Sequence, residues 1–270
     1  MESGTHSLII AAAGAAVAGD TILGQITLPA NGPYLVHHAF GNVVNATPTA
    51  AQAQLCSGVI RSVSGDVTPN PSPFVFPIME SEASLGATIN RGQCQTTMIP
   101  INWQAAGKAV MDLILRQYVV STVAPQAVMG VIFGKKRPTG EPATNMDAVR
   151  AAVAVAAEAA VGVITLATSA KKIVGIMPVL AQNGVVVTVE ELIGWVRLAS
   201  DDIDLAPSQW PFLSCYGAGL GALIQGSSGV LMRYWPVDIP VPGGARITVT
   251  VDLNTAVTNA AEVICYLLYN

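Results

Sequence analysis

Apolar and polar residues alternate with a period of two along much of this chain, which is the pattern of half-buried β-strands. Residues 245–253 show it most clearly, because Ala, Ile, Val, Val and Leu alternate there with Arg, Thr, Thr and Asp. The less regular run at residues 108–118 and the β-branched run at 185–189 also suit strands. Glycines and prolines interrupt these runs at short intervals, as expected of sandwiches with many strands. The pattern predicts an all-β fold of antiparallel β-sandwiches with a minor helical content.

Two segments carry helix signals. Residues 49–61 are interpreted as a short helix, with Thr47 as N-cap and Pro48 at the first helical position. The Ala-rich residues 147–160 are interpreted as a second helix that Asp147 caps. In the internal repeat this second segment corresponds to residues 7–18, whose pattern resembles a strand. The sequence therefore leaves both helix and strand open at residues 147–160.

The chain contains an internal repeat. Ile-Pro-Ile at residues 99–101 corresponds to Ile-Pro-Val at 239–241, and Met-Asp-Leu at 111–113 corresponds to Val-Asp-Leu at 251–253, both at an offset of 140 residues. Three weaker correspondences keep the same order along the chain, namely residues 22–32 with 174–184, 71–76 with 207–212, and 128–133 with 263–268. Their shared order indicates one structural unit present twice.

A polar stretch that contains two glycines and two prolines separates the two repeats. It follows a completed apolar strand, and this is the composition of a linker between domains. We expect an N-terminal sandwich at residues 1–134, a linker at residues 135–145 and a C-terminal sandwich at residues 146–270, both sandwiches being of the jelly-roll type.

Composition narrows the function classes. Hydrophobic residues make up 51% of the chain and the mean hydropathy is +0.51, which excludes a disordered chain. Charged residues make up only 11%, against about 25% in an average soluble domain. A net charge of −4 provides no general basic field, so we expect no sequence-specific nucleic-acid partner. A surface with so few charges is suited to burial in extensive subunit contacts.

The sequence contains none of the common catalytic signatures. The four cysteines lie far apart in sequence, so we expect mainly buried thiols, with at least one disulfide as the alternative. The adjacent His37 and His38 are expected on opposite faces of a strand, which does not suit a shared metal ion. Nucleophile-elbow and phosphate-loop patterns are absent from the sequence. We expect neither an enzyme nor a cofactor.

Three groups of residues remain as candidate sites. Asp201, Asp202 and Asp204 offer oxygen ligands for calcium, with a solvated loop as the alternative. The basic run at residues 135–137 is either a short patch for phosphate or lipid head groups or a solvated linker. Trp103 and Trp235 are interpreted as exposed anchors of subunit interfaces.

Targeting segments are not expected. Residues 1–6 lack the cationic region of a secretory signal, and the apolar residues 7–18 are too short to span a bilayer. Residues 151–167 are longer but contain Glu158, so a membrane span is the weaker alternative there.

Two consecutive β-sandwiches joined by a short linker resemble the double jelly-roll major capsid proteins of tailless icosahedral viruses. The resemblance covers about residues 22–268, and it rests on the repeat and on the strand-rich, charge-poor composition. It implies a jelly roll in each half, homotrimers that act as pseudo-hexameric capsomers, and self-assembly into an icosahedral shell. The partners that it implies are other copies, other capsid proteins and an internal membrane. The location that it implies is the virion, assembled inside the host cell.

Two other function classes stay open. One is a tandem β-sandwich binding module, such as a lectin or adhesin, that uses the three aspartates with a metal ion. The other is a subunit of an extracellular filament or surface layer.

Overall fold

The fold is that of a computed structural model. It describes residues 4–44, 55–69, 73–79, 96–118, 120, 124–154, 156–182, 190–205, 208–212, 216–218, 234–253 and 261–270. Within these ranges every regular element is a β-strand, so the predicted all-β class is confirmed. The same ranges contain no helix that is long and apolar enough to cross a bilayer.

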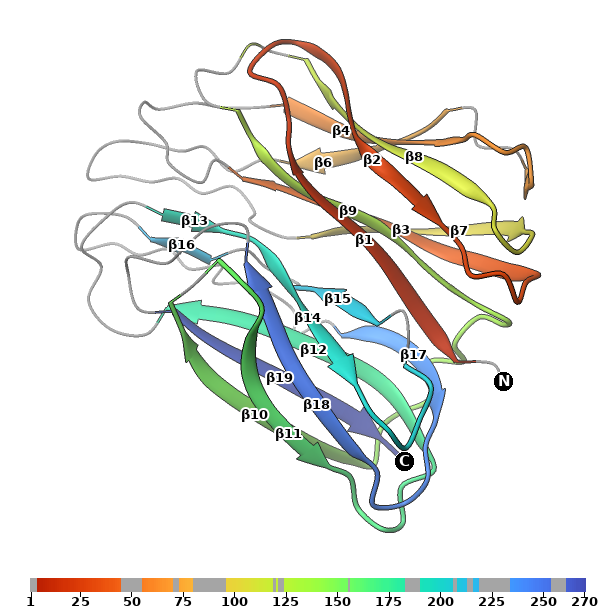
Figure 1. Ribbon diagram of the computed structural model, residues 1–270, viewed down its shortest axis with the longest axis vertical. Coiled ribbons are helices and arrows are strands. Elements are labelled where there is room, and N and C mark those ends of the chain that lie inside the picture. The colour runs from red at the N-terminus through yellow and green to blue at the C-terminus, as the bar shows by residue number, and fades with distance from the viewer. Residues whose placement is uncertain are drawn as a thin grey trace.

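The first half of the chain forms two facing antiparallel sheets, of order β1-β9-β3-β7-β5 and β2-β8-β4-β6 (Figure 1). Its described strands are β1 (Thr5–Ala13), β2 (Gly19–Thr27), β3 (Tyr34–Val44), β4 (Leu55–Ser62), β5 (Val67–Thr68), β6 (Phe74–Met79), β7 (Thr97–Ala105), β8 (Val110–Gln117) and β9 (Gln126–Gly134).

The second half forms sheets of order β10-β19-β12-β17 and β11-β18-β14-β15, with a short β13-β16 pair beside them. Its described strands are β10 (Asn145–Val153), β11 (Ala159–Thr165), β12 (Lys172–Gln182), β13 (Glu190–Leu192), β14 (Gly194–Ala199), β15 (Gln209–Pro211), β16 (Tyr216–Ala218), β17 (Trp235–Pro240), β18 (Arg246–Leu253) and β19 (Ala261–Tyr269).

The two halves have the same topology. With the short β5, β13 and β16 set aside, each half has eight main strands, and the first pairs with the last, the second with the seventh, the third with the sixth and the fourth with the fifth. This nesting of pairs is the jelly roll. The prediction of two tandem jelly-roll sandwiches is confirmed. The unit boundaries at residues 134 and 146 stay a prediction, with β9 ending at Gly134 and β10 beginning at Asn145.

Irregularities of the strands also recur at equivalent places. A β-bulge shifts the register in the second strand of each half and again in the third strand of each half, between Ile22 and Gly24, Ala160 and Gly162, Val36 and His38, and Ile173 and Gly175. Bulges bend a strand and change which face its side chains occupy. Because the bulges recur at equivalent places, the two halves share local irregularities of their strands as well as the order of the strands.

The turn between the sixth and seventh main strands is duplicated as well. It comprises residues 106–109 in the first half and 242–245 in the second, and in each the fourth residue donates its N–H to the carbonyl of the first. Lys108 and Gly244 occupy the same place and both have positive φ, 65° and 78°. Glycine adopts this conformation without strain, whereas lysine does not.

The helix predicted at residues 147–160 is wrong. Residues 145–153 form β10, residues 159–165 form β11, and β10 pairs along its whole length with β19. Alanine has the highest helix propensity, but propensities differ by less than about 1 kcal/mol per ordinary residue, and pairing with β19 overrides that preference. The strand-like interpretation of residues 7–18 is confirmed for residues 7–13, which belong to β1, whereas residues 14–18 lie outside the strand. Within the segment 49–61, residues 55–61 belong to β4, and the proposed cap at Thr47 and Pro48 lies outside the described residues.

Each half has its own hydrophobic core between its two sheets. The five-stranded sheet of the first half also contributes to the second core, because Phe40, Val128 and Ile132 belong to that cluster. Their neighbours on β9, Ala127 and Met129, point into the first core instead. β9 is therefore buried on both faces where the halves meet, which explains its nearly continuous apolar sequence.

Candidate assembly surfaces

The contact between the two jelly rolls has an aromatic centre. The rings of Phe40 on β3 and Trp235 on β17 lie 5.3 Å apart and tilted by 58°, and both side chains are fully buried. The indole Nε1 of Trp235 donates a hydrogen bond of 2.8 Å to the carbonyl of Pro211. Aromatic pairs of this geometry stabilise a contact beyond the area that they bury.

Polar contacts surround this centre. The backbone N–H of Asp238 donates to the hydroxyl of Thr5 at 3.0 Å, and the hydroxyl of Thr96 donates to the carbonyl of Phe212 at 2.6 Å. The hydroxyl of Ser7 donates to the carbonyl of Gln209. Each bond joins the first half to the second, so their relative orientation is specified by hydrogen bonds as well as by apolar burial.

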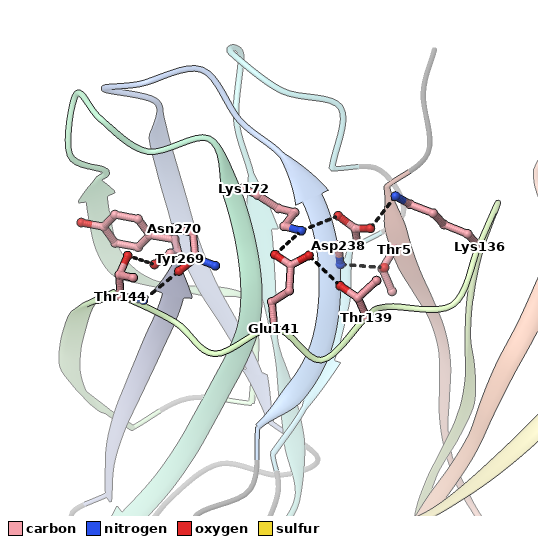
Figure 2. Close-up of polar contacts among 9 residues, drawn as sticks. All are labelled: Thr5, Lys136, Thr139, Glu141, Thr144, Lys172, Asp238, Tyr269 and Asn270. Carbon is pink, nitrogen blue, oxygen red and sulfur yellow. Dashed lines mark hydrogen bonds and ion pairs between the residues drawn. The ribbon is translucent and has the colours of Figure 1, made fainter.

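A cluster of four charged residues, which we call the linker clamp, fastens the linker to the second half (Figure 2). The carboxylate of Asp238 on β17, only 6% exposed, lies 2.8 Å from the Lys136 ammonium and 3.7 Å from that of Lys172. Lys172 also pairs at 2.6 Å with Glu141 of the linker. Two cations and two anions thus balance, and the chain between the jelly rolls is held along β17.

The ion pair between Glu141 and Lys172 shifts the pKa of both residues. The Lys172 ammonium, through its hydrogen bond to the carboxylate, holds the pKa of Glu141 below its usual range. The same hydrogen bond, to Glu141, raises the pKa of Lys172. Both residues therefore stay charged across the neutral range, and the ion pair between them persists there.

The other cations of the linker are also engaged within the chain. The Lys135 ammonium donates to the carbonyls of Asn31 and Pro33 and lies 4.5 Å from the centre of the Tyr34 ring. The Arg137 guanidinium donates to the carbonyl of Ile101 at 2.5 Å. Lys135 and Arg137 thus bind the linker to the first half, whereas Lys136 binds it to the second, and neither interpretation of this basic run anticipated these contacts.

The three aspartates of the predicted calcium loop lie on two different hollows of the surface. Asp201 and Asp202 line one hollow together with Arg246, whose backbone N–H donates to the Asp202 carboxylate at 2.9 Å. Asp204 lines the other hollow beside Arg197. Among the described residues, no three His, Cys, Asp or Glu side chains are grouped to hold a metal ion. Calcium binding at Asp201, Asp202 and Asp204 stays a prediction of the sequence, which a calcium-dependent melting shift would test.

The expectation that Trp103 and Trp235 are exposed is wrong. Their exposed fractions are 5% and 0%, and Trp103 packs edge-on against Phe74 at 5.1 Å in the first core. Indole rings bury a large apolar area, and the jelly-roll cores provide the sites for that burial. Trp235 does lie at an interface, but at the one between the two halves of the same chain.

His37 and His38 meet rather than point apart. The bulge at this place in β3 interrupts the alternation of faces and brings their Nδ1 atoms to 2.9 Å. Burial lowers the pKa of His37 to about 3 and that of His38 to about 4, with further lowering from Arg137. Both imidazoles are therefore neutral near pH 7. A bulge has no clear signature in a single sequence, so period-two reasoning could not anticipate this pair.

Two of the four cysteines lie in the described residues. Cys56 and Cys265 are both buried, and burial raises the pKa of the Cys265 thiol to about 12. A thiol of this kind is chemically inert and packs as a small apolar side chain. Cys94 and Cys215 lie outside the described residues, so the expectation of mainly buried thiols stays a prediction for them.

Sequence comparison yields no relatives, because neither a protein family nor a curated protein matches the chain. Solved structures resemble it weakly, and three viral chains are examples. A chain from a structure of the triple jelly-roll fold and turret assembly in an archaeal virus has 11% identity and a TM-score of 0.22, over 97% of this chain and 58% of that one. A Sulfolobus turreted icosahedral virus chain has 11% identity and a TM-score of 0.23, with the same coverages. A chain of cowpea mosaic virus empty particles has 8% identity and a TM-score of 0.27, over 99% and 89%.

This chain therefore spans 58% of the length of the two archaeal-virus chains. TM-scores this low do not establish a shared fold. The assignment of the jelly-roll fold therefore rests on the strand pairing described above.

Proposed function

We propose that this chain is a major capsid subunit whose mechanism is self-assembly, and that it has no enzymatic activity. The proposal is carried by one observation, the presence of two jelly rolls of identical strand order in one chain. Jelly rolls are found in viral capsids, but also in lectins and cupins, so the fold alone does not decide function. The duplication of the jelly roll within one chain favours a capsid lattice over these other functions, for a geometric reason.

A trimer of a duplicated unit presents six similar blocks around one axis. Such a pseudo-hexameric capsomer occupies one position of a hexagonal lattice with three copies of the chain. A chain with a single jelly roll would need six copies for the same position. This use of duplication requires that the two halves keep a fixed orientation. The Phe40–Trp235 contact and the linker clamp supply that rigidity.

The surface composition supports the same proposal. Charged residues make up 11% of the chain, so much of its surface consists of small polar and apolar side chains. Extensive contacts between copies would cover such a surface. The location that follows is the virion, with other copies as the main partners and further capsid proteins or an internal membrane beside them.

Negative-stain electron microscopy of the purified chain, together with light scattering at increasing concentration, tests the proposal. Trimers of hexagonal outline, or closed shells, are the expected result. A monomer that persists at about 100 µM would overturn the proposal, because capsid contacts are formed well below that concentration. Calcium-dependent glycan binding by such a monomer would favour the lectin-like module instead.

The double variant Phe40→Ala with Asp238→Ala provides a mechanistic check. It removes the aromatic contact and both ion pairs of Asp238, and it leaves the Lys172–Glu141 pair of the linker clamp and the outer faces of both jelly rolls in place. If rigid coupling of the halves underlies assembly, this variant forms fewer capsomers while both halves keep their β-sheet circular dichroism.

A further inference from the structure

The contact between the two jelly rolls joins two unlike surfaces. The first half contributes the outer face of its sheet at β1, β9 and β3, where Val128 and Ile132 are 1% and 0% exposed because the second half covers them. The second half contributes the edge formed by β15 and β17, and β1 contacts both of these strands. In a duplicated fold, such a contact leaves one surface of each kind unused. These are the β6–β7 edge of the first half and the outer face of β10, β19 and β12 on the second.

The β-bulge in the third strand of each half shows which residues of the two sheet faces are equivalent. The pair directly before the bulge is Val36 with Phe133 in the first half and Ile173 with Tyr269 in the second. Phe133 on β9 and Tyr269 on β19 therefore occupy the same place in the two jelly rolls.

The residues directly before these two are Ile132 and Leu268, which pair with Ser7 on β1 and with Met146 on β10. Met146 is therefore the counterpart of Ser7. Ser7 is fully buried against the second half, whereas Met146 is 57% exposed. Leu268 is likewise partly exposed, whereas its counterpart Ile132 is fully buried. Figure 1 shows β10 on the side of the second jelly roll away from the first.

The outward side chains of β10 and β19 are mainly apolar. Five of them, which we call the free face, are exposed or partly exposed: Met146, Ala148, Ile264, Tyr266 and Leu268. They are neighbours, because Met146 pairs with Leu268 and Ala148 with Tyr266. The ion pair between Arg150 and Glu262, at 3.3 Å, borders the free face at one end. An apolar centre with a charged border is the usual anatomy of a protein interface.

The duplicated turn shows which residues of the two edges are equivalent. It aligns Ile114 with Thr250, each of which lies six residues after the positive-φ position of its turn. The register leads from Ile114 across β4 to Val75 on β6, and from Thr250 across β14 to Gln209 on β15. Val75 is therefore the counterpart of Gln209. It is 42% exposed, on the last strand of its sheet.

The counterparts of the two exposed residues are in contact within the chain. The hydroxyl of Ser7 donates to the carbonyl of Gln209, and a β-bridge joins Ser7 to the neighbouring Ser208. Their counterparts Met146 and Val75 are two of the large apolar side chains that the chain leaves exposed. A polar pair within the chain thus corresponds to an apolar pair, so each pair is matched in chemistry.

A second pair of positions is matched as well. Within the chain, the N–H of Asp238 donates to the hydroxyl of Thr5 at 3.0 Å. By the same alignment their counterparts are Asn102 and Thr144, which are both exposed and polar. Neither is charged, so a contact between these positions brings no like charges together.

We propose that the free face of one copy binds the β6–β7 edge of the next copy, with Met146 beside Val75 of the partner subunit. The contact within the chain is then repeated between chains. Because the two surfaces are unlike, copies join head to tail, and such a series closes into a ring or continues as a filament. The inference deepens the proposed capsid function, and it rests on that function for the closure of three copies into a ring of six jelly rolls.

Sedimentation velocity of the full chain, from about 1 to 100 µM at neutral pH, measures the association. Met146→Asp and Val75→Asp each place a charge in the contact, and we expect each to weaken the association by at least about 10-fold. Both positions are exposed, so both variants keep the fold. Unchanged association in either variant would overturn the inference.

The double variant Met146→Asp with Val75→Lys tests whether these two positions meet. In a head-to-tail series every contact then places an aspartate beside a lysine, and we expect the association to recover most of what Met146→Asp loses. Val75→Lys alone is expected to weaken the association, as Val75→Asp does. A double variant that associates no better than Met146→Asp would overturn the inference.

Val163→Asp is the matched control. Val163 lies on β11, outside both proposed surfaces, and is 44% exposed. The variant adds the same charge to an apolar side chain of similar exposure in the same half of the chain, and we expect no effect on association. Equal weakening by Met146→Asp and Val163→Asp would overturn the inference.

Cross-linking distinguishes a head-to-tail contact from a symmetric one. Met146→Cys and Val75→Cys chains are mixed and treated with a short bis-maleimide, with the wild type as control for the native thiols. We expect covalent pairs in the mixture, and no more than the wild-type background in either variant alone. Pairs formed equally by one variant alone would overturn the inference.

The same measurements separate this inference from the capsid proposal. Trimers or shells that form equally well in Met146→Asp would overturn the inference and leave the capsid proposal standing. Open filaments that Met146→Asp and Val75→Asp both dissociate, without trimers or shells, would support the inference and overturn the capsid proposal. A monomer that persists at about 100 µM would overturn both.

Discussion

Phe40 and Trp235 join the two jelly rolls through a buried ring contact of 5.3 Å. Gly130 makes room for it, because a Cβ at that position would lie 2.5 Å from Cζ of Phe40. Phe40 belongs to the core of the second half although β3 is part of the first. The stability of the two halves is therefore coupled.

Phe40→Ala is expected to lower the free energy of unfolding by about 3–5 kcal/mol, from lost burial and the cavity left behind. It should also split thermal unfolding into two calorimetric transitions, because the coupling contact is gone. Phe76→Ala removes an equally buried ring inside the first core, and we expect a similar loss in one transition. Identical calorimetric profiles for the two variants would contradict the coupling.

Lys108 and Gly244 provide a matched test of backbone strain. Lys108→Gly is expected to raise the free energy of unfolding by about 1 kcal/mol, since glycine tolerates a φ of 65°. Gly244→Lys, at a φ of 78° in the equivalent turn, should lower it by a similar amount. Urea unfolding measures both. Destabilisation by Lys108→Gly would mean that side-chain contacts of the lysine outweigh the strain.

Asp238→Ala is expected to cost about 1–3 kcal/mol, because a nearly buried carboxylate and its two lysine partners are separated. The readout specific to the linker clamp is cleavage by trypsin after Lys135 or Lys136, which should accelerate roughly 10-fold. Glu262→Ala breaks the pair with Arg150, a residue 75% exposed, and should change neither quantity appreciably. Unchanged proteolysis of Asp238→Ala would show that the linker is held by other contacts.

The buried histidine pair predicts a loss of stability in mild acid. His37 and His38 have pKa values of about 3 and 4 in the folded chain, against 6.5 when unfolded. Between pH 6.5 and 4.5 the unfolded chain therefore binds protons that the folded chain does not, and stability falls as pH falls. Each histidine contributes up to about 1.4 kcal/mol per pH unit in this window.

Urea unfolding at pH 6.5 and 4.5 measures that slope. His37→Phe should remove about half of it, and His37→Phe with His38→Gln nearly all of it. The lowered pKa values of Asp20 and Asp112 act in the same direction but below this window, since unperturbed aspartate titrates at 3.8. An undiminished slope in the double variant would contradict the assignment.

The sequence repeat predicted most of the strand equivalences. Residues 99–101 and 239–241 lie in β7 and β17, and residues 111–113 and 251–253 lie in β8 and β18, which are equivalent strands. These matches succeeded because a strand buried in the same place of the same fold needs the same alternation.

One equivalence was wrong. Residues 22–32 were matched with 174–184, but they contain β2, whereas 174–182 belong to β12, whose equivalent is β3. In sequence, Asn-Gly follows the second main strand of the first half and the third main strand of the second half, so the dipeptide does not identify a particular strand.

The candidate surfaces were harder to predict than the fold. The linker clamp joins Lys136 and Glu141 to Lys172 and Asp238 across the fold, and no sequence spacing signals such a pairing. The contact between His37 and His38 depends on a bulge in β3. Register and bulges arise from tertiary packing, so sequence patterns alone located the strands but not these surfaces.

The sharing of Phe40, Val128 and Ile132 between the halves has a consequence for biosynthesis. The first jelly roll leaves the ribosome with this apolar side uncovered, and its cover exists only after β15 and β17 have been translated. At about 5–20 residues per second, that delay is roughly 5–20 s. During that interval the nascent chain exposes these apolar side chains to solvent. Slowing elongation over the second half would therefore increase the yield of aggregates.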